Sequence, residues 1–471
     1  MIGRVLRVSG WLSLVAATVS SAQPAEEAHA SADAAPWDDE LLTGPHLRPI
    51  LGARLEALVA AGTNETRNAA LRATERSGPF AVELDGHTEG REGLTHHDAN
   101  GRARVGNANA RLEAIGDYNV LEQGALSLTT RSYGARGLLL SKSTRVLGLD
   151  HELGLGGGAV ELAGDVTDDD PEMEPHGKSL RTLRGKHRYI DAYIHDTIRV
   201  IEQLDIRGGF VFEHWKWLTS YHPRHDDNEM AEEIAVPEAT EAVLSPRVSA
   251  IYRVDDQIAL RGDAFRTLRP PTFEEIYAAQ VRPEVVSTLE LGPRITAGPL
   301  EASTAVFWSE SASPLVAVRS ADGSAALVNA DASHATGVDT AASLRATKSW
   351  RATVGYTYAH SIITRADAYP ELVATQSALV PRHRATAAVT FDEPKLVTLT
   401  GAVRYVSRQL YDGAYTVVDA LAMRKLAGGV AGYLSVDNIF DRRYVTNATA
   451  IDANGIPRTI AIGVRVDSAK F

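Results

Sequence analysis

Residues 350–358 read Trp-Arg-Ala-Thr-Val-Gly-Tyr-Thr-Tyr, and apolar or aromatic side chains occupy every second position. In an extended chain, Trp350, Val354 and Tyr358 lie on one face. Arg351 and Thr353 lie on the opposite face. A strand with this pattern borders two environments, one apolar and one polar.

The same alternation recurs in other stretches of the chain: residues 204–212, 397–405, 430–436 and 460–466. Several patterned runs are about ten residues long, which is the length that a tilted membrane-spanning strand needs. Strands of soluble sandwiches are shorter, about five or six residues. The pattern predicts an all-β fold, a transmembrane antiparallel β-barrel of about 18–22 strands whose apolar faces contact lipid.

The surrounding solvent requires that such a sheet be closed. In hydrocarbon, every backbone N–H and C=O group must be paired within the protein, so an open sheet edge is not tolerated. A helical membrane protein is excluded, because no stretch has the roughly 18 consecutive apolar residues that a spanning helix requires. In the alternative fold, a soluble periplasmic β-rich binding protein, the apolar faces would form the core of a sandwich.

Composition narrows the possible functions. The 471-residue chain has 48 Lys and Arg against 60 Asp and Glu, a formal net charge of −12. This acidic balance argues against nucleic-acid binding, which needs clustered cations. The chain has no cysteine, so disulfides, thiolate metal sites and thiol nucleophiles are excluded. An exported chain without cysteine favours a bacterial envelope protein over a disulfide-stabilised secreted domain.

Three regions follow one another along the chain. Residues 1–22 combine Arg4 and Arg7, a short apolar run and small residues at the end, which predicts a cleavable signal peptide. Residues 23–64 are expected to form a short leader and helix. We expect the barrel to occupy residues 65–471. The apolar positions of the expected helix are Leu47, Leu51, Leu55 and Leu58.

Unequal connections are typical of membrane barrels, in which short turns face one side and long loops face the other. The stretch around Asp255-Asp256 predicts a short turn. Residues 165–177 and 219–242 predict long acidic loops on the external side. A third external loop follows Arg269, and in it Thr272 and Glu275 have the spacing of a capping box for a short helix.

Two groups of residues have the composition of catalytic sites but not the expected geometry. His97-Asp98 and His195-Asp196 resemble hydrolase dyads, yet neighbouring residues on a strand point to opposite faces. The glycine-rich residues 153–158 lack the following helix whose N-terminus would bind phosphate. We interpret them as a strand with small residues where side chains crowd.

A histidine-rich stretch could form a ferric or divalent-cation patch, but we interpret it as solvated loop residues; its members are His214, His222, His225, Asp226 and Asp227. Trp215 and Trp217 predict a position at the membrane interface. We assign no catalytic, cofactor-binding or metal-ligating residue and no cofactor, and we expect no enzymatic activity.

Five segments resemble, in the same order, motifs of the barrel portion of TonB-dependent outer-membrane receptors. Asn438-Ile-Phe-Asp441-Arg-Arg-Tyr444 is similar to the family segment N-[LI]-F-[DN]-x-x-Y. Arg269-Pro-Pro-Thr-Phe-Glu-Glu275 is similar to the segment R-x-P-[ST]-x-x-E. The five segments are residues 190–197, 265–292, 329–339, 434–444 and 455–463.

The resemblance implies an outer-membrane barrel that binds a scarce nutrient, such as a ferric siderophore or cobalamin, and imports it by gated permeation. It implies contact with outer-membrane lipid and, where a plug is supplied, with a TonB-type energising complex. Family members carry an N-terminal plug domain, and residues 23–64 are too short to form one. A plugless passive channel or a truncated receptor remnant is therefore the alternative function.

Overall fold

The computed structural model describes residues 54–467, with gaps at 64–66, 78–79, 92–93, 107–109, 124–125, 142, 171–178, 225–233, 272–274, 276–280, 320–324, 378–379, 394, 409–412, 448–452 and 456. The expected signal peptide and leader, and the first part of the expected helix, lie outside the described residues. Within the described part, no helix is long and apolar enough to cross a membrane.

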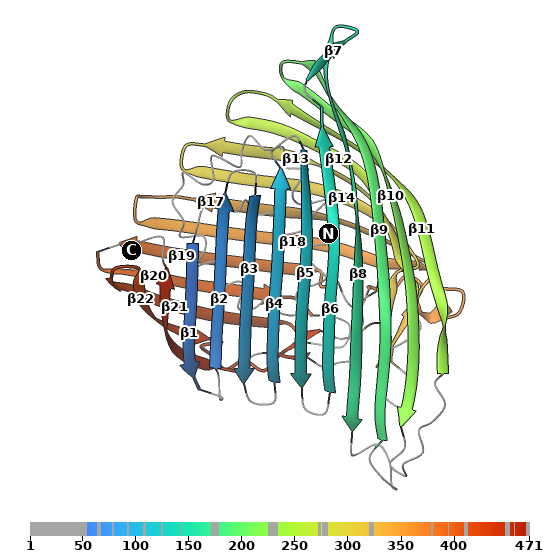
Figure 1. The fold of residues 1–471 in the computed structure, drawn as a ribbon. Helices are drawn as coiled ribbons and strands as arrows, with labels where there is room; N and C mark the ends of the chain where they lie inside the picture. Colours follow the sequence, from blue (N-terminus) through green and yellow to red (C-terminus); the bar gives the residue numbers. More distant parts are fainter. Residues whose placement is uncertain are drawn as a thin grey trace.

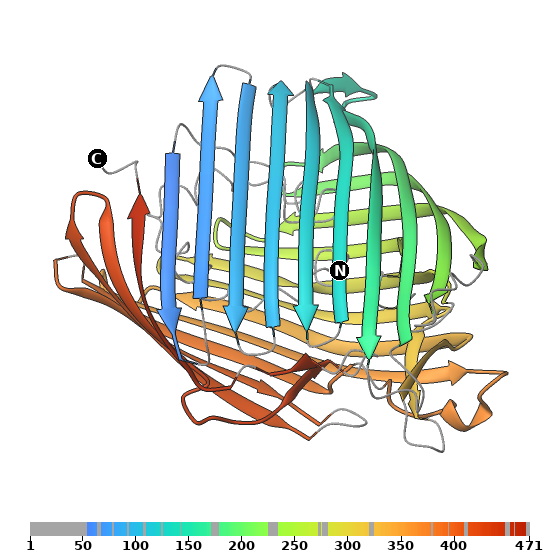
Figure 2. The same cartoon turned by 60° about the horizontal axis from the view of Figure 1, so that its bottom comes forward.

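Twenty antiparallel strands form a closed ring (Figures 1 and 2). β1 pairs with β2 on one side and with β25 on the other, so the sheet has no open edge. The first ten strands of the ring are β1 (Arg54–Gly62), β2 (Arg67–Ser77), β3 (Phe80–Arg91), β4 (Leu94–Gly106), β5 (Ala110–Gln123), β6 (Leu126–Leu140), β8 (Leu149–Asp170), β9 (Ser179–Ile201), β10 (Leu204–Arg224) and β11 (Ile234–Arg253).

The second half of the ring is β12 (Ile258–Arg269), β13 (Glu284–Ala297), β14 (Leu300–Ala312), β17 (Ala332–Leu344), β18 (Trp350–Arg365), β19 (His383–Glu393), β20 (Val397–Val406), β21 (Tyr415–Ala427), β22 (Val430–Asp437) and β25 (Thr459–Asp467). Short β7 (Thr144–Val146) pairs only with β8 and projects beyond the ring (Figure 1). The predicted barrel of 18–22 strands is confirmed.

The helix expected at Leu47–Leu58 is wrong over its described part, because Leu55 and Leu58 lie in strand β1. The barrel therefore includes residues before position 65. Leu55 and Val59 are exposed on one face of β1, and the other positions of that face are the alanines Ala57 and Ala61. Alanine carries little hydrophobic signal, so the leucine spacing favoured a helix while the period of two was hidden. Pairing with both β2 and β25 decides the conformation.

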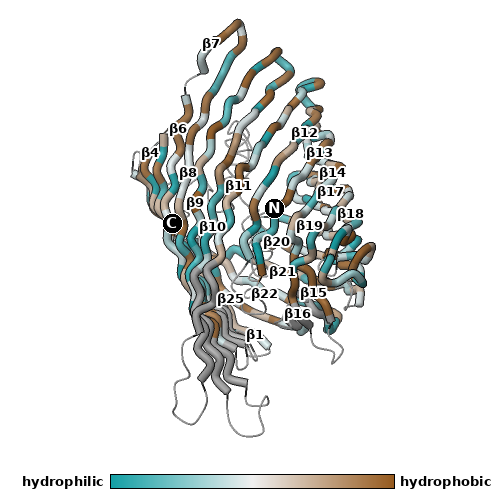
Figure 3. The backbone as a smooth tube through the Cα atoms, turned by 90° about the vertical axis from the view of Figure 1, so that its right-hand side faces the viewer, coloured by the Kyte–Doolittle hydropathy of each residue, from teal (hydrophilic) through white to brown (hydrophobic). Residues whose placement is uncertain are grey.

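The predicted two-faced strands are present (Figure 3). On β25, Ile462 is 69% exposed on the outer face, whereas Ala461 beside it is buried. On β20, Leu399 is exposed and its neighbours Thr398 and Thr400 are buried on the inner face. Because the outer face is the apolar one, the exposed leucines, valines and isoleucines require a lipid environment.

Aromatic side chains form two bands on this outer face, as expected at the two membrane interfaces. In the external half of their strands, the exposed rings are Tyr118, Trp308 and Tyr405, and the exposed rings of Tyr133 and Tyr356 lie near the middle of β6 and β18. Near the opposite end of the strands, the rings are Phe80, Tyr252, Trp350 and Phe391, and the last two have centroids 5.0 Å apart.

The two ends of the barrel differ in their connections. Residues 202–203, 298–299 and 428–429 are short turns at one end, which marks that end as periplasmic. The opposite, external end carries the long connections: residues 270–283, 313–331, 366–382 and 438–458. The predicted short turn at Asp255-Asp256 is at the periplasmic end.

Two predicted loops are shorter than expected. Residues 165–170 continue β8, and residues 219–224 and 234–242 belong to β10 and β11. The backbone ladder continues beyond the apolar band, where water tolerates acidic side chains. The acidic residues therefore begin where these strands leave the apolar part of the membrane, and the strands themselves continue further.

Substitutions on the two faces of β18 test this orientation. Val354→Arg, on the lipid face, is expected to lower the free energy of unfolding by about 2–4 kcal/mol. Thr353→Arg, on the inner face, leaves the guanidinium in the lumen and is expected to change it by less than about 1 kcal/mol. Urea titrations of refolding into lipid vesicles measure both values, and equal losses would contradict the orientation.

Candidate functional site

The inner wall of the barrel is strongly polar along β2 to β5. Glu83 accepts hydrogen bonds from Arg72 and Arg102, and the Arg102 Nε lies 3.4 Å from a Glu113 oxygen. Two inward-facing pairs further along β3 and β4, His87 Nδ1 is 3.2 Å from an Asp98 oxygen. These side chains alternate with lipid-facing apolar ones, so this part of the wall would line an aqueous path.

A buried carboxylate, Glu213, joins four strands in another part of the wall, β9 to β12. Its side chain is 1% exposed. Tyr189 on β9 donates a hydrogen bond to it at 2.8 Å, and Ser245 on β11 donates another. The hydroxyl of Thr267 on β12 and the backbone N–H of Leu268 lie 3.4 and 3.3 Å from its oxygens. Glu213 therefore ties the middle of β9, β10 and β11 to the external end of β12.

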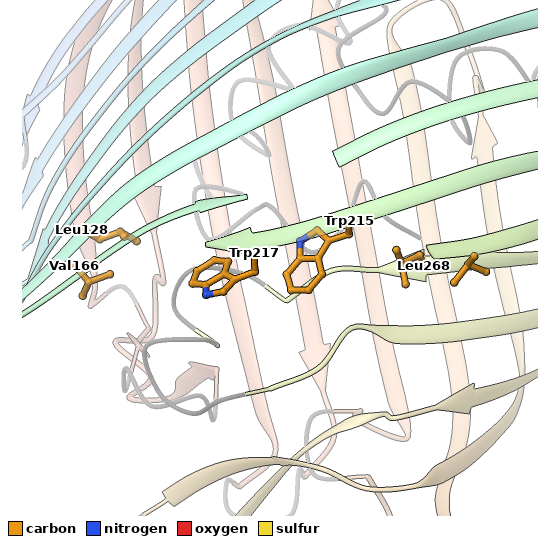
Figure 4. Packing of buried hydrophobic residues seen from close by; sticks show 6 residues of the cluster. Leu128, Val166, Trp215, Trp217 and Leu268 are labelled. Carbon is orange, nitrogen blue, oxygen red and sulfur yellow. The ribbon is translucent and has the colours of Figure 1, made fainter. Parts of the chain in front are cut away.

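Trp215 and Trp217 follow Glu213 on β10 and share its inner face. Figure 4 shows the two indole rings next to each other. They are 1% and 2% exposed, and they pack with Leu128, Val166, Val243 and Leu268. The indole N–H of Trp215 donates to His187 at 3.1 Å, and the Trp217 ring meets the same imidazole edge-on at 4.0 Å.

The prediction that these tryptophans mark the membrane interface is therefore wrong. Phe210 and Phe212 occupy the outer face of β10, so residues 215 and 217, which have the opposite parity, must face inward. The alternation of β10 predicts this inward position, and it prevails over the general preference of tryptophan for membrane interfaces.

The glycine-rich residues 153–158 lie on β8, and their predicted role is confirmed. A Cβ at Gly154 would lie 2.2 Å from the His195 ring, and one at Gly156 would lie 2.3 Å from the Tyr193 ring. The Tyr193 and His195 rings stack with centroids 6.1 Å apart. The glycines leave room for these two inward-facing rings.

The His-Asp pairs are separated by the strand alternation. His195 is buried on the inner face, and the adjacent Asp196 bonds His151 of β8 at 2.7 Å. His97 bonds Thr88 at 2.6 Å. His214 lies 3.3 Å from the Thr240 hydroxyl, while the side chain of His222 and residues 225–227 lie outside the described part. Among the residues that the structure describes, there is no group of three or more His, Asp or Glu able to hold a metal ion.

The external loops are braced by ionic and amide side chains. At the end of β12, Arg269 donates to both oxygens of Glu275 at 3.1 Å and to Glu284 of β13 at 2.8 Å. Glu275 is helical, as the capping-box pattern predicts, but Thr272 lies outside the described residues. This charge triad holds the two ends of the connection 270–283 together.

A second brace joins this connection to the next long one. The Asn329 side chain accepts a hydrogen bond from the Arg282 N–H at 2.6 Å and donates to the carbonyls of Arg282 and Ser313. Asn329 ends β16 (Ala325–Asn329), which pairs with β15 (Leu315–Arg319) as a separate hairpin. Buried Val316 and Ala330 pack this region on Ile363, near the external end of β18, and on Ala366 of the connection after it.

The third brace closes the connection between β22 and β25. Asn438 is 1% exposed, and its side chain bonds the backbone N–H and C=O of Arg442 at 2.8 and 2.9 Å. Asp441 accepts the Arg458 N–H at 2.9 Å. The Tyr444 ring packs on Tyr415, and a Cβ at Gly455 would lie 2.2 Å from it.

A family model described as "TonB dependent receptor-like, beta-barrel" matches residues 35–439 of the sequence. This chain belongs to that family. The three braces are built from the residues that carried the sequence resemblance, so the TonB-dependent receptor motifs at Arg269, Asn329 and Asn438 act as ties of the external loops. The search of curated proteins returned no match.

Solved receptors share the fold of this TonB-dependent receptor barrel. The ferric-catecholate import receptor Fiu of E. coli K12 has a TM-score of 0.63 at 12% identity, with 89% of this chain and 82% of that chain covered. The ferric yersiniabactin uptake receptor FyuA of Yersinia pestis has a TM-score of 0.61 at 16% identity, with 89% of this chain and 80% of that chain covered. The siderophore receptor PiuA of Acinetobacter baumannii has a TM-score of 0.62 at 13% identity, with 88% of this chain and 82% of that chain covered. The matching family and these structures are receptors and transporters rather than enzymes.

Replacing Asn438 tests the third brace. Asn438 has a φ of 51°, a left-handed conformation that alanine adopts with strain. Asn438→Ala removes the side-chain bonds and adds this strain, and is expected to lower the free energy of unfolding by about 2–4 kcal/mol. Asn438→Gly loses the bonds without the strain and should cost about 1 kcal/mol less. Refolding titrations in vesicles that found both variants as stable as the parent would contradict the role of Asn438.

Proposed function

We propose that this outer-membrane barrel binds a scarce nutrient at its external mouth and imports it, with ferric siderophores as the first candidate class and cobalamin as the second. Family membership over residues 35–439 is the observation that carries the proposal. The chemistry is recognition and gated permeation.

The inner wall supports this function. Its charged ladder from Arg72 to Glu113 would solvate a polar solute in transit, and the tyrosine, histidine and tryptophan cluster around Glu213 adds aromatic and polar groups near the middle of β9 and β10. Braced loops at the external mouth would keep a binding surface in a fixed shape, which limits the entropy lost on binding.

The proposal includes partners and export. Residues 1–22 would direct the chain to the envelope and be removed. A TonB-type complex would supply energy from the periplasmic side, acting through a plug. Uptake is then expected to stop when the proton gradient across the inner membrane is dissipated.

Site-specific blocking tests the path. The chain has no cysteine, so single cysteines can be labelled selectively. Glu241 is exposed and shares the inner face of β11 with Val243, whereas Glu310 is exposed on the outer face of β14 with Trp308. Labelling Glu241→Cys with a polyethylene-glycol maleimide should lower uptake of radiolabelled ferric siderophores at least several-fold, and labelling Glu310→Cys should leave it unchanged.

The same full-length protein in planar bilayers separates energised import from passive permeation. Low conductance together with gradient-dependent uptake supports the proposal. A large, steady conductance with uptake that ignores the gradient would favour a passive channel instead, since wide barrels without a plug leave an aqueous lumen.

A further inference from the structure

We propose that one sector of the periplasmic end of the barrel binds the acidic N-terminal segment of the same chain. Four exposed cations on neighbouring strand ends and turns form this sector, which we call the basic rim: Arg345, Lys348, Lys395 and Lys425. The acidic segment is residues 23–40, which lie outside the described residues. This docking surface is at the opposite end of the barrel from the external mouth at which the proposed import begins.

Strand pairing gathers the basic rim. The connections β17–β18 and β19–β20 touch, because the Asp392 N–H donates a hydrogen bond to the Ser349 carbonyl at 2.7 Å. β20 pairs with β21, and Lys425 lies at the periplasmic end of β21. Because adjacent strands are about 4.8 Å apart, the stretch from β18 to β21 spans about 15 Å.

The basic rim carries an excess of positive charge. Residues 345–351, 392–396 and 424–425 contain six Lys and Arg against two acids, a formal charge of 6 − 2 = +4. One of the acids, Asp392, accepts a hydrogen bond from the Thr398 hydroxyl at 2.6 Å. Within the described part of the chain, none of the four exposed cations forms an ion pair. They are therefore available to an anionic partner.

Another sector of the same end has the reverse charge. The tips of the turns β9–β10 and β11–β12 carry three exposed acids: Glu202, Asp255 and Asp256. The cations behind them, Arg199 and Arg253, are paired with Asp205 at 3.2 and 2.6 Å. A negatively charged segment is attracted to the basic rim and repelled from these tips.

The acidic segment has the matching charge and enters the barrel beside the basic rim. Residues 23–40 contain six Asp and Glu and no Lys or Arg. At the start of β1, Glu56 pairs with Asp467, whose N–H donates to the Gly429 carbonyl in the β21–β22 turn at 2.9 Å. The first strand therefore begins next to the turn that follows Lys425 (Figure 2).

The intervening residues are long enough for docking. Residues 41–53 are 13 residues, which span about 20 Å as a flexible chain and about 45 Å when extended. The start of β1 is three strand spacings from β21, about 14 Å, and six spacings from β18, about 29 Å. The whole basic rim is within reach of the acidic segment.

Tethering compensates for the weakness of each contact. Ion pairs between exposed side chains are individually weak and are screened by salt. A short covalent tether raises the effective concentration of the segment to about the millimolar range, and several pairs can form together. The chain would thereby cover its own cations and withhold them from other anionic molecules of the periplasm.

Distances between two nitroxide labels test the docking in the exported protein, reconstituted in phosphatidylcholine vesicles. Ser31→Cys is labelled together with Ala346→Cys in the basic rim or, as the matched reference, with Gln203→Cys beside the acidic tips. Both rim positions are exposed, and both lie six to eight strands from β1, in opposite directions around the ring. Ser31 is tethered by 22 residues, so a free segment would sample about 26 Å around the start of β1 and give broad, similar distributions for both pairs.

The docked segment should give a narrow distance distribution for Ser31–Ala346, with a shorter mean than for Ser31–Gln203. Lys348→Gln with Lys395→Gln and Lys425→Gln should abolish this difference, and so should 1 M salt, where the screening length falls to about 3 Å. The control variant Arg184→Gln with Lys186→Gln and Arg188→Gln removes three exposed cations near the external end of β9 and should keep the difference.

Three results would overturn the proposal. The first is equal, broad distributions for both label pairs in the parent protein. The second is an unchanged Ser31–Ala346 distance in the folded basic-rim variant. The third is an equal effect of the control variant, which would indicate a response to net charge alone. Circular dichroism confirms that each variant is folded, and the distances do not depend on whether the barrel imports a nutrient.

Discussion

The rest of this structure depends on the pairing of backbone polar groups in a solvent that offers no hydrogen bonds. A strand in hydrocarbon must satisfy its N–H and C=O groups with neighbouring strands, and only a ring does so for every strand. The pairing of β1 with β25 meets this requirement, although the two strands come from opposite ends of the chain. Once the ring is closed, each side chain faces either lipid or the interior.

That division explains why polar chemistry is concentrated in two places. Inside the ring, charged residues can be retained because they face one another, as in the ladder from Arg72 to Glu113. Beyond the apolar band, strands and loops are in water, and charges such as Arg269 and Glu284 tie the long connections together. The family motifs at Arg269, Asn329 and Asn438 lie in this second region, where loops need specific side chains to fix their shape.

Alternation in the sequence was sufficient to predict the fold class and the approximate strand number, because lipid imposes a period of two on every spanning strand. It failed at β1, where alanines weaken the contrast between faces and helical spacing of leucines competes. Alternation also places Trp215 and Trp217 on the inner face, because Phe210 and Phe212 face outward. The general preference of tryptophan for membrane interfaces predicts the wrong side here. The partners of Glu213 could not be predicted, since Tyr189, Ser245 and Thr267 come from three other strands whose register is set only by folding.

A disulfide across the seam tests closure most directly, because the chain has no cysteine of its own. Thr63 and Ile460 are a hydrogen-bonded pair, so Leu58 and Arg465, five steps along the same register, form the closely spaced, non-hydrogen-bonded kind. The folded Leu58→Cys, Arg465→Cys protein should oxidise to a disulfide that alters migration in a non-reducing gel. Leu58→Cys with Ala431→Cys, one strand further around the ring, should not. No disulfide in the first protein, or equal oxidation in both, would contradict a barrel closed by β1 and β25.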